Sequence, residues 1–163
     1  MTINGARVGF GFDAHRFSDN RPLKLCGVHI KGTCGLEGTS DADVALHAVI
    51  DALLGAVALG DIGELFPSSD AVFQDADSRH LLAATVRLLA DAKFKVGNVD
   101  ITIVVESVRI SPYRDEMREV VAGLLDTDIR QVSVKATSTD GLGLVGRQEG
   151  IAAMAVAIVE KHD

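Results

Sequence analysis

The 163-residue sequence has few of the residues that stabilise small secreted scaffolds. It contains two cysteines, three prolines and no tryptophan, and aromatic residues make up only 4% of it. Cys26 and Cys34 are too few for a disulfide framework and form no CxxC pattern, so we expect free thiols in a reducing compartment. No apolar run approaches the length of a membrane span, and the N-terminus lacks the apolar core of a signal peptide. These absences predict a soluble, cytoplasmic protein.

Positive charge is also scarce. Sixteen Lys and Arg residues stand against 23 Asp and Glu residues, which gives a net charge of −7 without any dense basic cluster. Nucleic acid and anionic membrane surfaces are therefore excluded as expected partners. A phosphorylated metabolite is still compatible with an acidic protein, provided that metal ions or backbone amides offset the repulsion.

Small aliphatic residues supply most of the 47% hydrophobic content, and their periodicity alternates between strand and helix. The pattern predicts strands at 7–12, 23–30, 98–106, 132–137 and 151–159, and helices at 44–59, 79–92 and 113–125. A glycine-rich loop is predicted at 31–38, and an irregular segment, either a lid or a surface loop, at 65–77. We expect one α+β domain over 1–163, with a mixed β-sheet, helices on one sheet face, and the other face packed in an oligomer.

The predicted helix at 44–59 is apolar except for a polar stripe. Asp43, His47 and Asp51 follow at intervals of four residues, so they are expected on one helix face. Such a stripe serves either a site or solvent contact, and a histidine between two aspartates favours a site. Thr39 and Ser40 are the expected N-cap residues, and the free N–H groups of the first turn would suit a phosphate. Gly60 is expected to end the helix.

A second Asp-His pair lies at the end of the first predicted strand. Asp13 and His15 are two residues apart, so in an extended chain they project to the same side. Together with His47 they offer one carboxylate and two imidazoles. Three protein ligands with a fourth position open is the arrangement of catalytic zinc. His29 and His80 are competing ligand candidates, but neither has a comparable carboxylate neighbour.

A third polar cluster, Thr137-Ser138-Thr139-Asp140, follows the strand at 132–137. Its hydroxyls could donate to phosphate, and Asp140 is a hard oxygen ligand that suits Mg²⁺. The alternative is a serine- and threonine-rich turn without chemistry. Two metal sites and several hydroxyls together indicate phosphate chemistry, in which positioning and charge neutralisation do most of the work.

Five motifs, in order along the chain, carry a resemblance to a known family. They are GFDAH at 11–15, SDADVALHA at 40–48, GDIG at 60–63, VKATSTDGLG at 134–143 and GRQEG at 146–150. With them the sequence resembles the 2-C-methyl-D-erythritol 2,4-cyclodiphosphate synthase family over essentially its whole length. The resemblance implies a homotrimer with active sites between adjacent subunits. It also implies a reaction of non-mevalonate isoprenoid synthesis, in which the 2-phosphate of a cytidine-diphosphate methylerythritol attacks the β-phosphate and CMP leaves.

Matched position by position, the resemblance implies a role for each motif. Asp13, His15 and His47 would bind Zn²⁺ or another divalent cation, and Asp140 would bind Mg²⁺ or Mn²⁺. Thr39 and Ser138 would be catalytic. Arg147 and Glu149 would lie at the trimer axis, where an isoprenoid diphosphate can bind. The implied substrate-binding residues are Asp13, His15, Thr39, Ser40, Asp61, Ile62, Gly63, Phe66, Pro67, Ser68, Ser69, Asp70, Val105, Glu106, Ser107, Val108, Arg109, Ile110, Ser111, Thr137, Ser138, Thr139, Asp140, Leu144 and Arg147.

The sequence departs from the family pattern at three positions. Thr39 stands where the family usually has a histidine that helps to hold the reacting diphosphate. Ser68 stands where many members have aspartate, and Ser138 where the usual residue is threonine. Loss of one charge-stabilising donor costs on the order of 10²–10³ in turnover, so Thr39 is expected to slow the enzyme. The same ligands would also suit a zinc phosphohydrolase, or a non-catalytic trimer that binds a nucleotide or an isoprenoid diphosphate.

Overall fold

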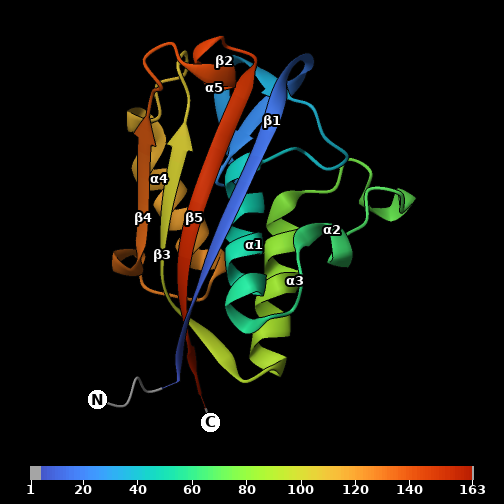
Figure 1. Cartoon of the computed structure of the whole chain (residues 1–163), viewed down its shortest axis with the longest axis vertical. Coiled ribbons are helices and arrows are strands. Elements are labelled where there is room, and N and C mark those ends of the chain that lie inside the picture. Colours follow the sequence, from blue (N-terminus) through green and yellow to red (C-terminus); the bar gives the residue numbers. More distant parts are fainter. Residues whose placement is uncertain (1–4, 163) are drawn as a thin grey trace.

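The alternation of small and larger apolar residues builds a five-stranded mixed sheet with the three long helices packed against one face (Figure 1). The structure is a computed structural model that describes residues 5–162. The strands are β1 (Ala6–Leu25), β2 (Val28–Leu36), β3 (Phe94–Val104), β4 (Val132–Thr137) and β5 (Gly150–Lys161). The helices are α1 (Val44–Val57), α2 (Ile62–Leu65), α3 (Ser78–Asp91), α4 (Arg114–Leu124) and α5 (Gly143–Gly146), with 3-10 turns at Ala71–Phe73, Ser111–Tyr113 and Ile129–Gln131. The predicted α+β architecture is confirmed.

The strand order is β2-β1-β5-β3-β4, and β1 contributes to it twice. Its first half pairs antiparallel with β5 as far as Arg16, and its second half pairs antiparallel with β2 from Phe17 onward. β3 pairs antiparallel with β5 and parallel with β4. The crossover from β3 to β4 contains α4. The start of β5 therefore lies beside the middle of β1, at the point where β1 changes partners.

Two predictions for the N-terminal third are wrong. Residues 23–30 are not one strand, because the chain reverses at Cys26 and Gly27, both with positive φ, between β1 and β2. Residues 31–38 are not a loop, because β2 continues to Leu36 in register with β1. Pairing with β1 holds this glycine-rich segment extended, and local composition does not reveal such pairing.

Close packing of α1 on the sheet depends on glycine and alanine. A Cβ on Gly9 would lie 1.8 Å from the carbonyl oxygen of Ala52, and a Cβ on Gly11 would lie 1.9 Å from that of Ala48. Any side chain at these positions would push the helix away from β1. On β5 the alternating alanines face the helices and are buried. The small residues of both strands therefore let α1 lie directly on the backbone of the sheet.

The structure corrects both predicted ends of this helix. Asp43, rather than Thr39 or Ser40, is the N-cap, and its carboxylate accepts the N–H of Leu46. The C-terminal end is at Ala58, which takes the left-handed conformation, while Leu59 N donates to Leu54 O at 3.0 Å. Because Asp43 already caps the first turn, the expected phosphate site at this helix end is not supported.

The outer face of the sheet is apolar. The short helix α5 covers one end of it, where Val145 packs with Val104 and Ala152, and the long helices lie on the other face. Side chains from β1 and β5 between 37% and 66% exposed gather on the outer face, namely Val8, Phe10, Phe12, Met154, Val156 and Ile158. Figure 1 shows these two strands side by side at the front, with α1, α3 and α4 behind. Within residues 5–162 no helix is both long and apolar enough to cross a bilayer.

Candidate metal centre

Two neighbouring elements bring the predicted ligands together. Asp13 and His15 lie at the end of the first half of β1, just before that strand changes partners. His47 lies in the first turn of α1, which packs against β1 at Gly11. The close approach of helix and strand therefore decides that His47 reaches the Asp-His pair.

The donor atoms of these three side chains converge on one point. Asp13 Oδ2 is 2.9 Å from both His15 Nε2 and His47 Nδ1, and the two imidazole nitrogens are 3.2 Å apart. Tetrahedral zinc with nitrogen and oxygen ligands separates adjacent donors by about 3.3 Å. The set therefore fits a divalent cation after small side-chain shifts, and it is the candidate metal site of the described chain.

The electrostatics of this site favour an ionised Asp13. Burial by itself raises the pKa of Asp13, but the hydrogen bonds with His15 and His47 outweigh it and hold the pKa well below its usual range. Burial lowers the pKa of His15, but the Asp13 carboxylate raises it above its usual value. The carboxylate is thus kept ionised, as a metal ligand must be.

The predicted polar stripe of α1 separates into three different roles. His47 is 7% exposed and faces the site. Asp43 is fully buried, where its carboxylate accepts the N–H groups of Cys26, Gly27 and Leu46. Asp51 accepts the N–H of Ile62 at 2.8 Å and so holds the start of α2. The expectation that all three serve one site is wrong for both aspartates.

A cavity of about 330 Å³ opens beside the three ligands. Ten of the implied substrate residues line it, namely Asp13, His15, Thr39, Ser40, Ile62, Gly63, Phe66, Pro67, Ser68 and Ser69, together with His47. Phe73 and Leu81 also line it, and no sequence pattern predicts this. Asp61 and Asp70 lie next to it as caps of α2 and of the turn at Ala71–Phe73. The GDIG motif at 60–63 therefore leads directly into the short helix α2.

Most of the remaining implied residues, Val105–Ser111 and Thr137–Asp140, follow the ends of β3 and β4, where the second of these segments and Glu106 form a second cluster. Glu106 organises it, because its Oε1 accepts from the backbone N and the hydroxyl of Thr139, at 2.8 and 2.9 Å. The hydrogen bond from the Thr139 N–H lowers the pKa of Glu106. Ser138 Oγ lies 3.4 Å from Asp140 Oδ1, and both side chains are accessible.

The two clusters do not meet within one chain. Strand register places Ala14, Ala152, Val104 and Thr137 in one row across β1, β5, β3 and β4. Three strand spacings separate the ends of that row by about 14 Å. Leu144 is closer, since it borders a small hollow with His15, while Arg147 pairs with Glu149 at 2.6 Å. The implied site residues are therefore divided between two places at the same end of the sheet.

The sequence analysis missed two residues behind the metal site. His47 Nε2 lies 3.0 Å from Ser78 Oγ, which in turn donates to Asp41 Oδ1 at 2.5 Å. Both residues have strong capping propensity, and only that local role is visible in the sequence. His29 and His80, the competing ligand candidates, are both exposed and lie outside the cluster.

Comparisons with known proteins give one consistent result. The chain matches the YgbB family over residues 6–160. It is 51% identical over 157 residues to the 2-C-methyl-D-erythritol 2,4-cyclodiphosphate synthase of Shouchella clausii, covering 96% of this chain and 99% of that protein. It is similar to the Plasmodium falciparum IspF–CDP complex, with a TM-score of 0.84 and 29% identity over 99% of this chain and 100% of that one. Against the bifunctional IspDF of Campylobacter jejuni the TM-score is 0.93, with 40% identity over 97% of this chain and 43% of that protein.

Proposed function

The chain belongs to the YgbB family of 2-C-methyl-D-erythritol 2,4-cyclodiphosphate synthases, and from this premise we propose how its residues carry out the reaction. The enzyme converts 4-diphosphocytidyl-2-C-methyl-D-erythritol 2-phosphate to the 2,4-cyclodiphosphate in the non-mevalonate isoprenoid pathway. CMP is the leaving group. The observation that carries the proposal is the convergence of Asp13, His15 and His47 at the wall of a 330 Å³ cavity.

Asp13, His15 and His47 would hold Zn²⁺ or another divalent cation, and Asp140 would contribute to a Mg²⁺ or Mn²⁺ site. When bound, these cations neutralise phosphate charge and fix the orientation of the two phosphates. The donor set supports this assignment, because one carboxylate and two neutral imidazoles leave a fourth position free for a phosphate oxygen. No strong base is required from the protein, since the attacking phosphate is already ionised at neutral pH.

The protein's own residues bind and align the substrate. The cavity wall from Ile62 to Ser69 would hold the methylerythritol part, beside the Thr39 and Ser40 hydroxyls. Val105–Ser111 would bind the cytosine, and Ser138 would donate to the diphosphate. Tethering both phosphates on one molecule makes the attack unimolecular, which contributes up to about 7–11 kcal/mol when alignment is good.

The division of the site supports a homotrimer with active sites between adjacent subunits. The outer face of β1 and β5 exposes apolar side chains that a second and third copy would cover. Packing these faces around a three-fold axis would set the Thr137–Asp140 cluster of one subunit against the metal ligands of the next. Arg147 and Glu149 would then lie near the axis, where an isoprenoid diphosphate is the expected further ligand.

The assay that tests these roles follows CMP release from the substrate with Zn²⁺ and Mg²⁺ present. The parent protein should form CMP and the cyclic diphosphate in equal amounts, and His47→Ala should lose both. Full activity of His47→Ala would overturn the metal assignment. Release of inorganic phosphate without a cyclic product would indicate a phosphohydrolase, and tight binding without CMP would indicate a non-catalytic binding protein.

Thr39 gives the sharper test of the catalytic assignment, because it lines the cavity next to the metal ligands. Replacing it with histidine would supply a donor that can carry charge to the reacting diphosphate. We expect Thr39→His to raise turnover by about 10- to 100-fold with little change in zinc affinity. Thr39→Val, which keeps the shape and removes the hydroxyl, serves as the matched control and should be slower than the parent.

A further inference from the structure

The buried ring of His47 has partners on both of its nitrogens. Nδ1 faces Asp13 and His15, as described above. Nε2 lies 3.0 Å from Ser78 Oγ and 3.0 Å from Ser40 Oγ. A neutral imidazole carries one proton, and the nitrogen that binds a metal must be the one without it. His47 can therefore act as a ligand through Nδ1 only while its proton is on Nε2.

Ser78 favours that tautomer, because its single proton is already committed. The residue is fully buried, and its hydroxyl donates to Asp41 Oδ1 at 2.5 Å. An ionised carboxylate only accepts, so the Ser78 oxygen presents lone pairs to His47. Those lone pairs attract an Nε2–H and repel an unprotonated Nε2. Ser40 can donate or accept, so it does not select a tautomer by itself.

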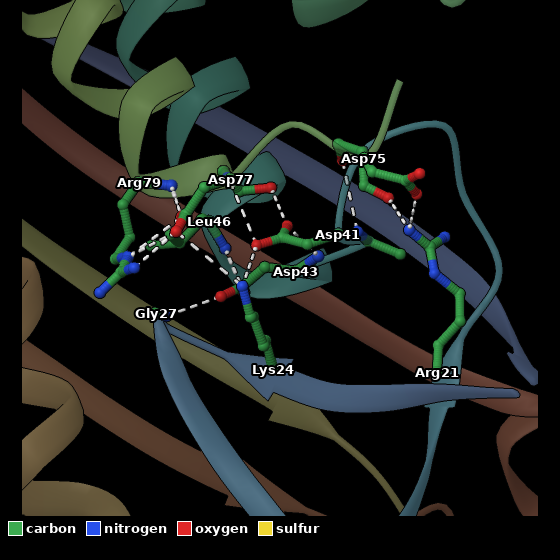
Figure 2. A network of polar contacts seen from close by, with 12 residues as sticks. Arg21, Lys24, Gly27, Asp41, Asp43, Leu46, Asp75, Asp77 and Arg79 are labelled. Carbon is green, nitrogen blue, oxygen red and sulfur yellow. Dashed lines mark hydrogen bonds and ion pairs between the residues drawn. The ribbon is translucent and has the colours of Figure 1, made fainter. Parts of the chain in front are cut away.

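Asp41 is held in place as a charged acceptor from several directions. Its Oδ2 accepts from Lys24 Nζ and from the Ser78 N–H, both at 3.2 Å, and its Oδ1 accepts the Asp43 N–H at 3.3 Å. Figure 2 shows Lys24 beside Asp41 and Asp77. The Lys24 ammonium stabilises the negative charge, and the backbone donors fix the direction in which Asp41 points.

Ion pairs around this contact tie three chain segments together. Arg79 pairs with Asp77 at the start of α3, and Arg21 pairs with Asp75 at 3.0 Å, as Figure 2 shows. Arg21 also donates to the carbonyl oxygens of Gly38 and Ser40, in the loop that leads to α1. The second half of β1, this loop and the start of α3 are thereby held in one arrangement behind His47.

We propose that Ser78 and Asp41 are positioning residues for the metal centre: the Ser78 oxygen, oriented by Asp41, accepts the Nε2–H that His47 keeps when its Nδ1 binds the metal, and so stabilises the metal-binding tautomer. The inference rests on the proposed role of His47 as a metal ligand. Outer partners that orient a ligating histidine typically contribute 10- to 100-fold to metal affinity. Neither residue touches the substrate cavity, so their effect should appear in metal binding before it appears in substrate binding.

Zinc affinity of the purified protein, measured by competition with a chromophoric chelator, tests the proposal without substrate. Ser78→Ala and Asp41→Asn should each weaken Zn²⁺ binding by about 10- to 100-fold. Thr85→Val is the matched control, because it removes another buried hydroxyl from α3 that donates only to Leu81 O, at 3.0 Å. Affinity in both variants within threefold of the parent, or an equal loss in the control, would overturn the proposal.

Nitrogen NMR of the ¹⁵N-histidine-labelled, zinc-loaded protein gives a second readout that a merely structural role would not move. In the metal-free protein the Asp13 carboxylate competes by accepting from Nδ1 at 2.9 Å, so the Nε2 proton is followed in the loaded state. The parent should show a His47 Nε2–H signal that is hydrogen-bonded and slow to exchange with water. In Asp41→Asn the side-chain NH₂ can donate to Ser78, whose hydroxyl then becomes free to turn toward Nε2. That variant should exchange the Nε2 proton faster, and an unchanged exchange rate would contradict the proposal.

The two levels of inference can fail separately. A parent protein that binds no Zn²⁺ would refute the metal site itself. A parent that binds Zn²⁺ as tightly as its Ser78 and Asp41 variants do would refute only the positioning role. Should Ser78→Ala not fold, Asp41→Asn decides alone, because it keeps the size and shape of the side chain.

Discussion

The two clusters of site residues differ in how far one chain completes them. The Asp13, His15 and His47 cluster lies in a cavity, with defined partners on every ligand. The Thr137–Asp140 cluster is exposed and held mainly by the single carboxylate of Glu106. The first therefore has its hydrogen-bond partners in place within one chain, whereas the second, in the proposed trimer, would be one wall of a site completed by a neighbouring subunit.

This difference follows from where each cluster lies on the sheet. The metal ligands lie under α1, where the backbone of β1 and the helix are in direct contact. The second cluster follows the edge strand β4, which has a neighbouring strand on one side only. A site that needs both clusters is therefore most simply completed by a second copy of the chain.

The largest expected effect comes from mixing two inactive variants. His15→Ala and Asp140→Ala should each lower CMP formation by about 10³ or more, because each removes one source of charge stabilisation. After joint dissociation and reassembly, the mixture should regain about a quarter of the wild-type rate. In a random cyclic trimer about one interface in four places intact metal ligands of one subunit against an intact Asp140 of the next.

Wild-type protein taken through the same cycle is the control for this experiment. A mixture as inactive as its two parents would mean that each site is built within one chain. The Thr137–Asp140 cluster would then not depend on a neighbouring subunit.

Close packing under the metal cluster should make it sensitive to added volume. Gly11→Ala places a methyl group against the carbonyl of Ala48, and should destabilise folding by about 1–3 kcal/mol and weaken zinc binding as His47 moves away. Gly55→Ala is the control, in the helix that packs on Gly11, because an added Cβ there has no neighbour within 4 Å. It should stabilise by about 0.5–1 kcal/mol in urea denaturation. Equal effects of the two variants would show that the packing is looser than described.

The second cluster should respond to a different change. Glu106→Gln replaces a carboxylate with an amide that accepts less strongly from the N–H and hydroxyl of Thr139, so the loop at 137–140 should lose order. We expect KM for the substrate to rise roughly tenfold through poorer alignment, with zinc affinity and thermal stability unchanged. Steady-state kinetics and the chelator assay together check this, and a parallel loss of zinc binding would mean that the clusters are coupled within one chain.

The smallest effect compares two equivalent Asp-Arg caps, one at the start of α3 behind the metal ligands and one before the start of β4, at the opposite end of that strand from the second cluster. Hydrogen bonds from Arg79 and Arg130 lower the pKa values of Asp77 and Asp128, each to about 2. Because the folded-state pKa lies below the usual 3.8, the stabilisation is present above pH 3.8 and is lost as the pH falls toward 2.

Asn variants of both caps keep the capping oxygen and remove the charge. Asp77→Asn should cost about 1 kcal/mol or less above pH 4, and this difference from the parent should disappear near pH 2 in acid denaturation curves. Asp128 is fully exposed, so its variant should show the smaller change, and salt should remove it. A larger loss of stability in Asp128→Asn than in Asp77→Asn would contradict this prediction.

Local patterns predicted much of the fold and of the metal site. The strands at 132–137 and 151–159 and the order of the long elements follow from hydrophobic periodicity, which acts over a few residues. Asp13 and His15 could be paired because extended backbone places residues i and i+2 on one side. His47 stood out as an imidazole on an apolar helix.

Only the tertiary structure decided which polar residues share a site. Helical spacing put Asp43 and Asp51 on the face of His47, but their neighbours turned one into a cap and the other into an anchor for α2. It also decided that the glycine-rich segment after residue 30 is held extended by pairing with β1, and that Ser78 and Asp41 lie behind His47. The two clusters of implied site residues are separated by three strand spacings, which only strand order and register determine. Sequence determines spacing along one element, whereas contacts between elements depend on packing and register, which no local pattern encodes.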